Sequence, residues 1–233
     1  MTLYSEAADR LFSARVAPKL WLAALAAYIA SDIALLFSET GDGTRIALVI
    51  LSLALLIAVI IAQWRVTRSM SGAPDSQRGS IEGWIGWLIL SALIYIGIPI
   101  AIVFGIWGVN ALDHELARLL FLVGTAVMAS LASPMLVHTT GQVIGANGIS
   151  FGKTLEGCRR FYLELGLANA AISAGLWGAA DVLISFVEPG VISPQTIMLT
   201  IGSTLLEFIQ FILLTALMTV AWSKVSQQQH EAI

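Results

Sequence analysis

The sequence is poor in charged residues and in cysteine. Only 12% of its 233 residues are Asp, Glu, Lys or Arg, while 58% are hydrophobic and the mean hydropathy is +0.86. A soluble domain carries about 25% charged residues. Half that density does not cover a water-facing surface of this size, which excludes a soluble globular enzyme, and the apolar content excludes intrinsic disorder. The class that remains is an integral membrane protein.

The cysteine count, the net charge and the missing motifs exclude further classes of protein. Cys158 is the only cysteine, so an internal disulfide framework and a multi-cysteine metal site are both excluded. A formal net charge of −3 gives no reason to expect nucleic acid as a partner. The sequence contains no His-Glu-x-x-His, no nucleophile elbow and no phosphate-binding loop. We therefore expect no enzymatic activity, no cofactor and no metal.

Long apolar runs are what the sequence has in abundance. A membrane span needs roughly 20 mostly apolar residues to cross a hydrocarbon core of about 30 Å, and such runs are helical because backbone groups in lipid must bond internally. Six segments qualify: about Leu20–Phe37, Ile46–Trp64, Ile81–Gly108, Leu116–Val137, Phe161–Val187 and Ile197–Trp222. The sequence predicts an all-α polytopic membrane protein in which residues 1–233 form one domain of six transmembrane helices and short interfacial helices.

The lysines and arginines between the spans predict the orientation of the chain. Ten of the twelve fall on one side of the six spans, and only Arg45 and Arg118 fall on the other. Loops in the cytoplasm carry the excess of Lys and Arg. We therefore expect both termini in the cytoplasm, residues 224–233 as a cytoplasmic tail, and a bacterial inner membrane as the location. The lipid bilayer is the first expected partner.

The first 18 residues are predicted to lie on the membrane. They place Leu3, Ala7 and Leu11 in one apolar row and Glu6 on the opposite face of a short amphipathic helix. Such a helix can lie in the cytoplasmic interface with its apolar face among the lipids. The alternative is that it covers the cytoplasmic end of the helix bundle.

Residues 150–160 form the second predicted interfacial segment. Ser150 is expected to cap a helix that begins at the next residue, because a serine hydroxyl can bond to the first free backbone N–H groups. Lys153, Arg159 and Arg160 supply positive charge for anionic lipid headgroups. We predict that this helix lies in the interface and turns into the fifth span.

The loop around this segment carries a series of small, turn-forming and basic residues. The series is Ser133-Pro134, Asn147-Gly148, Ser150-Phe151-Gly152-Lys153 and Gly157-Cys158-Arg159-Arg160-Phe161. On these residues the stretch 115–190, about a third of the chain, resembles the membrane-domain family associated with glycerophosphodiester phosphodiesterases and, more loosely, Yip-type membrane proteins. In that family the hydrolytic chemistry belongs to a separate soluble barrel domain, which these 233 residues do not contain. The resemblance implies a helical membrane module and no catalytic residue.

Small residues recur every four positions in two of the spans. They are Gly166, Ala170, Ala174 and Gly178 in the fifth span and Gly97, Ala101 and Gly105 in the third. Small residues at this spacing let helix backbones approach closely in lipid. We predict that these faces pack within the chain; the alternatives are a homo-oligomer and a membrane protein partner. Pro99 is expected to kink the third span, as a packing bend or as a hinge.

Three acidic residues lie inside the predicted spans, together with two amides. Asp32, Asp181 and Glu207 are the acids, Gln210 lies one turn after Glu207, and Asn169 is in the fifth span. An ionised carboxylate in lipid is costly, so these acids should face the protein interior or a cavity. The five side chains form a candidate intramembrane polar pocket. The alternative is that Asp32 and Asp181 are solvated near the headgroups.

Together these features favour a non-enzymatic scaffold, an accessory subunit or a lipid-associated module. The basic segment at residues 150–160 and the small-residue faces support this interpretation. The alternative is a small proton- or cation-linked transporter or permease that uses the intramembrane carboxylates. That function requires Asp32, Asp181 and Glu207 to converge, which the sequence does not show.

Overall fold

The structure is a computed structural model. It describes residues 2–13, 18–38, 46, 50–51, 61, 64–65, 67–71, 81–107, 114–145, 149–187 and 192–231. Every regular element within these residues is a helix, which confirms the all-α fold class. Most of the predicted second span, Ile46–Trp64, and the Asn147-Gly148 turn lie outside the described residues.

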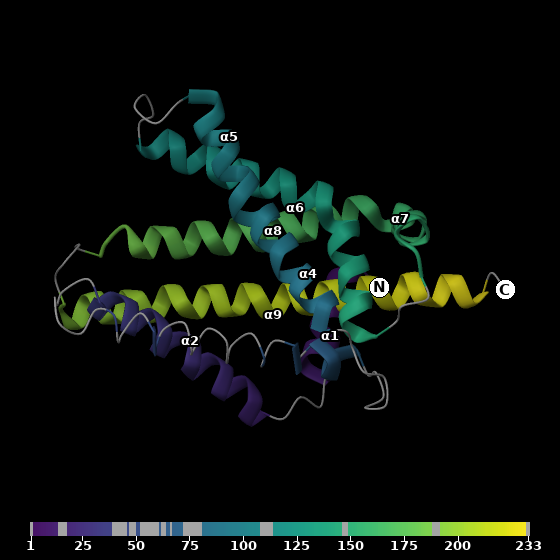
Figure 1. The fold of residues 1–233 in the computed structure, drawn as a ribbon, viewed down its shortest axis with the longest axis horizontal. Coiled ribbons are helices and arrows are strands. Elements are labelled where there is room, and N and C mark those ends of the chain that lie inside the picture. Colours follow the sequence, from purple (N-terminus) through teal and green to yellow (C-terminus); the bar gives the residue numbers. More distant parts are fainter. Residues whose placement is uncertain are drawn as a thin grey trace. The chain divides into compact units, whose positions relative to one another are not determined.

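Figure 1 shows the helices that the described residues form, labelled in chain order. They are α1 Leu3–Ser13, α2 Pro18–Ser38, α4 Ile81–Ala92, the π-helical turn η1 Leu93–Gly97, α5 Ile98–Trp107, α6 His114–Ile144, α7 Phe151–Cys158, the 3₁₀ turn η2 Arg159–Phe161, α8 Tyr162–Ile184 and α9 Pro194–Glu231.

Three described stretches are long and apolar enough to cross a membrane. They are Glu115–Ile144, Phe151–Ile184 and Pro194–Gln229, and they correspond to the predicted fourth, fifth and sixth spans. A shorter apolar stretch, Leu22–Ala34, lies within the predicted first span. The protein is therefore helical with three candidate membrane-spanning helices among its described residues, and the number of six spans stays a prediction.

The chain divides into two compact units. Unit 1 consists of Met1–Ala14, Thr67–Gly175 and Leu213–Ile233, and unit 2 of Arg15–Val66 and Leu176–Ile212. Each unit is thus assembled from segments that are far apart in the sequence.

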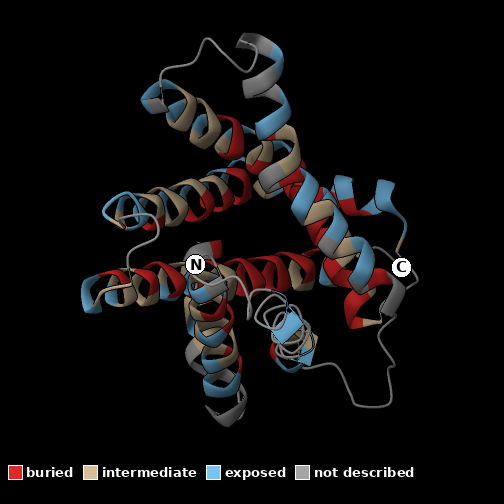
Figure 2. Cartoon of the chain, turned by 60° about the vertical axis from the view of Figure 1, so that its left-hand side comes forward, coloured by how far each residue is buried: buried red, intermediate tan, exposed pale blue. Residues whose placement is uncertain are grey.

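The C-terminal half of α9 contributes a continuous buried stretch to unit 1. Every residue from Leu214 to Trp222 is buried (Figure 2). A Cβ added at Gly141 of α6 would lie 2.6 Å from ring atoms of Trp222, so α6 can lie this close to the indole only because residue 141 is a glycine. Helix α9 continues as one helix to Glu231, so the described residues of the predicted tail 224–233 are helical.

Helix α6 does not end near Pro134, where the sequence suggested that a span closes. It runs through this proline to Ile144, and two side chains bond to the carbonyl of Ala129, five residues before the proline. The Ser133 hydroxyl donates to the Ala129 carbonyl at 2.6 Å, and Asn169 Nδ2 of α8 donates to the same carbonyl at 2.8 Å. The helix stops at Gly145, whose φ of 96° is a conformation that glycine adopts without a steric penalty.

The predicted kink at Pro99 lies directly after the π-helical turn. Ile98 N–H donates to the Leu93 carbonyl, which gives the wider turn that precedes α5. Pro99 is buried, and a Cβ added at Gly124 of α6 would lie 3.5 Å from the Pro99 Cβ. Pro99 therefore packs against α6 at Gly124.

The small residues of α5 do not make the contact with α6. Ala101 and Gly105 are exposed, and a Cβ added at Gly105 would meet no heavy atom within 4 Å. The reason is helical geometry, because residues two and six positions after Pro99 lie on the opposite side of the helix. Gly97, at the end of the π-helical turn, is half-buried, and its added Cβ would contact only Leu93 and Ala92 of its own helical segment.

Gly166 of α8, by contrast, is a close-packing position. It is buried, and an added Cβ would lie 3.4 Å from the Ser130 Cβ of α6. The Ser130 hydroxyl donates to the Gly166 carbonyl at 2.9 Å. The other small residues of this row, Ala170, Ala174 and Gly178, are half-buried.

Candidate functional site

Helix α1 lies against the protein through its apolar row. Thr2 precedes the helix and caps it, with Ser5 N–H donating to the Thr2 hydroxyl at 3.3 Å. Leu3 is 1% exposed and Ala7 is buried, so the row that was expected to face the interface or the bundle packs against unit 1. This favours the alternative in which α1 covers the end of the helix bundle.

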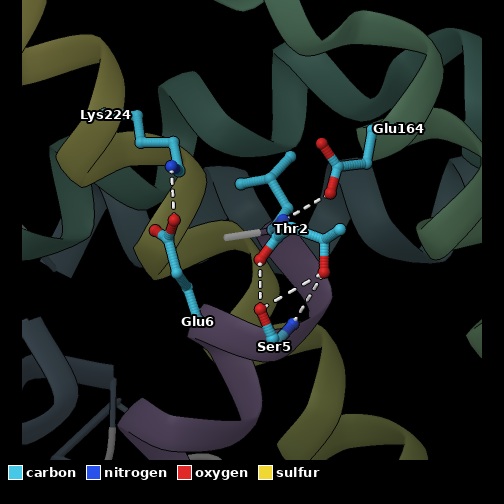
Figure 3. Close-up of polar contacts among 6 residues, drawn as sticks. Thr2, Ser5, Glu6, Glu164 and Lys224 are labelled. Atoms are coloured by element: carbon cyan, nitrogen blue, oxygen red, sulfur yellow. Dashed lines mark hydrogen bonds and ion pairs between the residues drawn. The ribbon is translucent and has the colours of Figure 1, made fainter.

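The polar groups of α1 are also paired with the protein (Figure 3). Lys224 Nζ of α9 lies 2.7 Å from Glu6 Oε1, and Arg10 Nη1 donates to the Ser223 hydroxyl at 2.7 Å. The backbone N–H of Leu3 donates to the carboxylate of Glu164 on α8. Helix α1 is therefore bonded to α8 through the Leu3 backbone and to α9 through the Glu6 and Arg10 side chains.

Helix α7 lies against α9 and α6 through a short buried face. The Ser150 hydroxyl accepts from the Lys153 backbone N–H, which confirms the predicted cap. Thr154, Gly157 and Cys158 are buried. A Cβ added at Gly157 would lie 3.0 Å from Val225 of α9, so a glycine is needed for the helices to lie this close.

His138 of α6 anchors this short helix. Its Nδ1 lies 3.1 Å from the Thr154 hydroxyl, which itself donates to the Ser150 carbonyl at 3.2 Å. The hydroxyl has one proton, so His138 Nδ1 is the donor of this pair. His138 Nε2 then accepts from Gln142 Nε2 at 3.3 Å, so both ring nitrogens of a neutral imidazole are satisfied. The sequence drew attention to histidine only as a metal ligand and missed this positioning role.

The outward face of α7 and of the turn η2 that follows it, here called the α7 face, carries positive charge that no described residue pairs. Lys153, Arg159 and Arg160 are exposed, and their side chains make no hydrogen bond or ion pair within the part of the chain that the structure describes. Phe151 is 42% exposed and Leu155 is 47% exposed beside them. Positive charge next to exposed apolar side chains is the pattern of a helix that lies at a membrane surface.

Two surface hollows flank Arg159 and Arg160. The first, of about 830 Å³, has an apolar wall that includes Leu155, Phe161 and Leu163. The second, of about 540 Å³, is lined by polar groups that include Lys153, Gln228 and Gln229. Arg159, Arg160 and Glu156 line both hollows. The first is called the apolar hollow and the second the polar hollow, and the guanidinium groups of Arg159 and Arg160 lie at the boundary between them.

In unit 2, two of the three predicted acids lie on one helix contact. The Tyr28 hydroxyl of α2 donates to Glu207 Oε2 of α9 at 3.0 Å, and the Thr204 hydroxyl of α9 donates to Asp32 Oδ2 of α2 at 2.6 Å. Ala24 and Phe208 form a small apolar core beside them. Each half-buried carboxylate therefore accepts a hydroxyl from the facing helix, which offsets part of the cost of its removal from water. The sequence did not identify Tyr28 or Thr204 as these donors.

The other three members of the predicted polar pocket are Asp181, Gln210 and Asn169. Asp181 is half-buried near the end of α8. Gln210 is buried, and its Oε1 has no hydrogen-bond partner among the described residues. Asn169 belongs to unit 1, where it bonds to Ala129 and Ser133 of α6, so the structure gives it a packing role.

Neither a metal cluster nor a relative identifies this site. Among the described residues no three His, Cys, Asp or Glu side chains gather as they would around a metal ion. Comparisons with family models, with curated proteins and with solved structures find no match for the chain. The resemblance of residues 115–190 to the phosphodiesterase-associated membrane domains therefore stays a prediction.

Proposed function

We propose that this chain is a non-enzymatic, lipid-associated module of a bacterial inner membrane. It would cross the membrane with six helices, keep both termini in the cytoplasm, and bind the anionic cytoplasmic surface through α7. The observation that carries the proposal is the unpaired, exposed positive charge of Lys153, Arg159 and Arg160. Each Lys or Arg near an anionic membrane surface contributes about 1 kcal/mol of attraction.

The position of α7 in the chain supports the same proposal. The turn η2 joins this helix to α8, and the three together form the apolar stretch Phe151–Ile184. Basic residues just outside a membrane span are the usual place for contact with lipid headgroups. The exposed Phe151 and Leu155 would enter the boundary between headgroups and acyl chains, while the three cations contact phosphates.

A photocrosslinking experiment tests this function. The full chain is reconstituted in vesicles of phosphatidylglycerol and phosphatidylcholine, with a photoreactive residue at position 155 of α7 or, as the control, at the exposed position Asp9 of α1. Lipid crosslinked from position 155 should contain more phosphatidylglycerol than the bulk vesicle, and the triple variant Lys153→Gln, Arg159→Gln, Arg160→Gln should abolish this excess. Bulk composition at position 155 in the unmodified sequence would contradict the proposal.

The α2–α9 contact supports a second candidate, a proton- or cation-linked transporter. The specific observation is that Asp32 and Glu207 lie on one helix contact, each with a hydroxyl donor from the facing helix. Vesicles with a trapped pH-sensitive dye should then show proton entry that the double variant Asp32→Asn, Glu207→Gln removes and Asp181→Asn retains. The transporter function fails if the double variant and the unmodified chain give the same flux.

A further inference from the structure

The α7 face offers more than diffuse positive charge, because its cations stand between two hollows of different character. Arg159 and Arg160 line both the apolar hollow and the polar hollow. Both volumes, about 830 and 540 Å³, fall within the range of roughly 300–1,000 Å³ that is typical of ligand pockets. An occupant that fills both must have an anionic end and an apolar end.

We propose that the two hollows together bind one molecule of an anionic phospholipid from the surrounding bilayer. Its phosphate lies at Arg159 and Arg160, its headgroup in the polar hollow, and one acyl chain in the apolar hollow. This inference rests on the proposed function and adds to it a defined site with a stoichiometry of one.

The side chains of the polar hollow fit a phosphate that carries a hydroxyl-bearing headgroup. A guanidinium presents a planar fork of donors that matches two phosphate oxygens, and two adjacent arginines are free for this contact. Lys153 adds a third cation, and the Gln228 and Gln229 side chains add neutral amides. Glu156 lines the hollow as well and forms no described ion pair, so it is an acceptor for headgroup hydroxyls.

The carboxylate on the apolar side is already paired. Glu164 lines the apolar hollow, and its carboxylate accepts the backbone N–H of Leu3 on α1. This hydrogen bond comes from a neutral N–H and leaves the charge of Glu164 in place, so the cations Lys153, Arg159 and Arg160 face two carboxylates, those of Glu156 and Glu164. The three positive charges exceed the two negative ones, and the site keeps a net positive charge. This balance favours an anionic lipid over a zwitterionic one.

An exposed apolar row on α8 continues the apolar hollow. Leu163, Leu167, Ala171 and Gly175 are exposed and follow one another at intervals of one turn. A Cβ added at Gly175 would meet nothing within 4 Å, so the far end of the row is open. Twelve residues of helix measure about 18 Å, which is close to half of a hydrocarbon core of about 30 Å. The row thus has the length that the acyl chain of one leaflet occupies.

Lipid titration of the full chain in detergent, followed by native mass spectrometry, tests the site. Dioleoyl phosphatidylglycerol should saturate at one molecule per chain, and dioleoyl phosphatidylcholine should bind at least tenfold more weakly. The double variant Arg159→Gln, Arg160→Gln should weaken phosphatidylglycerol binding at least tenfold. Lys224→Gln is the matched control, because it removes a cation that is paired with Glu6 and should leave the affinity unchanged.

Two further arms separate a lipid from a soluble phosphate. The double variant Leu163→Ser, Leu167→Ser removes the exposed apolar row and should weaken phosphatidylglycerol binding while its melting temperature stays unchanged. Soluble glycerol phosphate should not displace bound phosphatidylglycerol at equal concentration. Displacement at equal concentration would show a site for phosphate alone and would overturn the lipid assignment.

The possible failures of the site and of the proposed function differ in their readout. Charge-dependent phosphatidylglycerol binding that rises without saturation to many molecules would overturn the single site and leave the proposed function intact. Equal binding of the two lipids, with no effect of the arginine substitutions, would overturn both.

Discussion

Helices α1 and α7 are two short amphipathic helices of the same unit, and they differ in whether their charged side chains are paired within the protein. In α1 two of the charged side chains bond to the protein, with Glu6 paired to Lys224 and Arg10 bonded to Ser223. On the α7 face the cations Lys153, Arg159 and Arg160 have no described partner. Amphipathic spacing alone therefore does not distinguish a helix that covers the protein from one that presents charge to a ligand. The two kinds of helix differ in whether their charged side chains are paired.

The apolar residues of the two helices differ in the same way, and a matched pair of leucines tests this difference. Leu3 of α1 is 1% exposed, while Leu155 of α7 is 47% exposed. Leu3→Ala should weaken the docking of α1 by about 3 kcal/mol, because the substitution removes buried methyl groups and leaves a cavity. Amide hydrogen exchange over residues 3–13 should then speed up about a hundredfold. Leu155→Ala should leave exchange in α7 unchanged, and equal effects in both helices would erase the distinction between them.

Removal of the hydrogen bond between His138 and Thr154 should have the second-largest effect, a loss of stability in α7. Thr154→Val keeps the shape of the buried side chain and removes the hydroxyl that accepts from His138 Nδ1. Loss of one partner of a buried hydrogen bond costs about 1–3 kcal/mol. Amide exchange in α7 should accelerate accordingly, while Thr154→Ser, which keeps the hydroxyl, should stay closer to the unmodified chain. Unchanged exchange in the valine variant would exclude this anchor.

Alanine substitutions at two glycines of α7 should have smaller effects on stability, and the two effects should differ in sign. Gly157→Ala places a Cβ 3.0 Å from Val225 and should destabilise the α7–α9 contact by about 1 kcal/mol, net of the gain in helix propensity. Gly152→Ala places a Cβ in open space and should stabilise the helix by roughly 0.5–1 kcal/mol. Thermal unfolding checks both, and a stabilising Gly157→Ala would show that α7 does not lie this close to α9.

The smallest effect belongs to the ion pair of α1. The side chains of Lys224 and Glu6 are 30% and 28% exposed, so their coupling should be only about 0.2–1 kcal/mol and should fall with added salt. A double-mutant cycle of Glu6→Gln and Lys224→Gln on α1 hydrogen exchange measures it. Lys153→Gln should leave exchange in α7 unchanged, and a stability loss there would mean that Lys153 has a protein partner.

The sequence predicted the all-α class and the capping residue Ser150, because apolar run length and local hydrogen bonding are properties of short segments. It ended the fourth span at Val137, whereas helix α6 runs through Pro134 to Ile144. It also did not show that Asn169, 40 residues away, bonds to the Ala129 carbonyl just before the proline. The true stop is Gly145, whose positive φ ends the helix locally. A long-range hydrogen bond such as that from Asn169 to Ala129 cannot be read from a single sequence.

The candidate sites show the same limit. The sequence drew attention to the charged residues Asp32, Glu207 and Arg160, because charge in or beside a span is rare. It did not predict that Asp32 bonds to Thr204, 172 residues later, or that Asn169 lies in the other unit. Helical spacing defines which residues share a face, but the neighbour of that face is determined by tertiary packing.

The proposed function requires that the unpaired cations Lys153, Arg159 and Arg160 select anionic lipid. The most direct measurement is the association constant of spin-labelled phosphatidylglycerol relative to spin-labelled phosphatidylcholine for the reconstituted chain, obtained by electron paramagnetic resonance. We predict a ratio clearly above one that falls to about one in the variant Lys153→Gln, Arg159→Gln, Arg160→Gln and is retained in Lys224→Gln. A ratio that is the same in the unmodified chain and in the triple variant would contradict the claim.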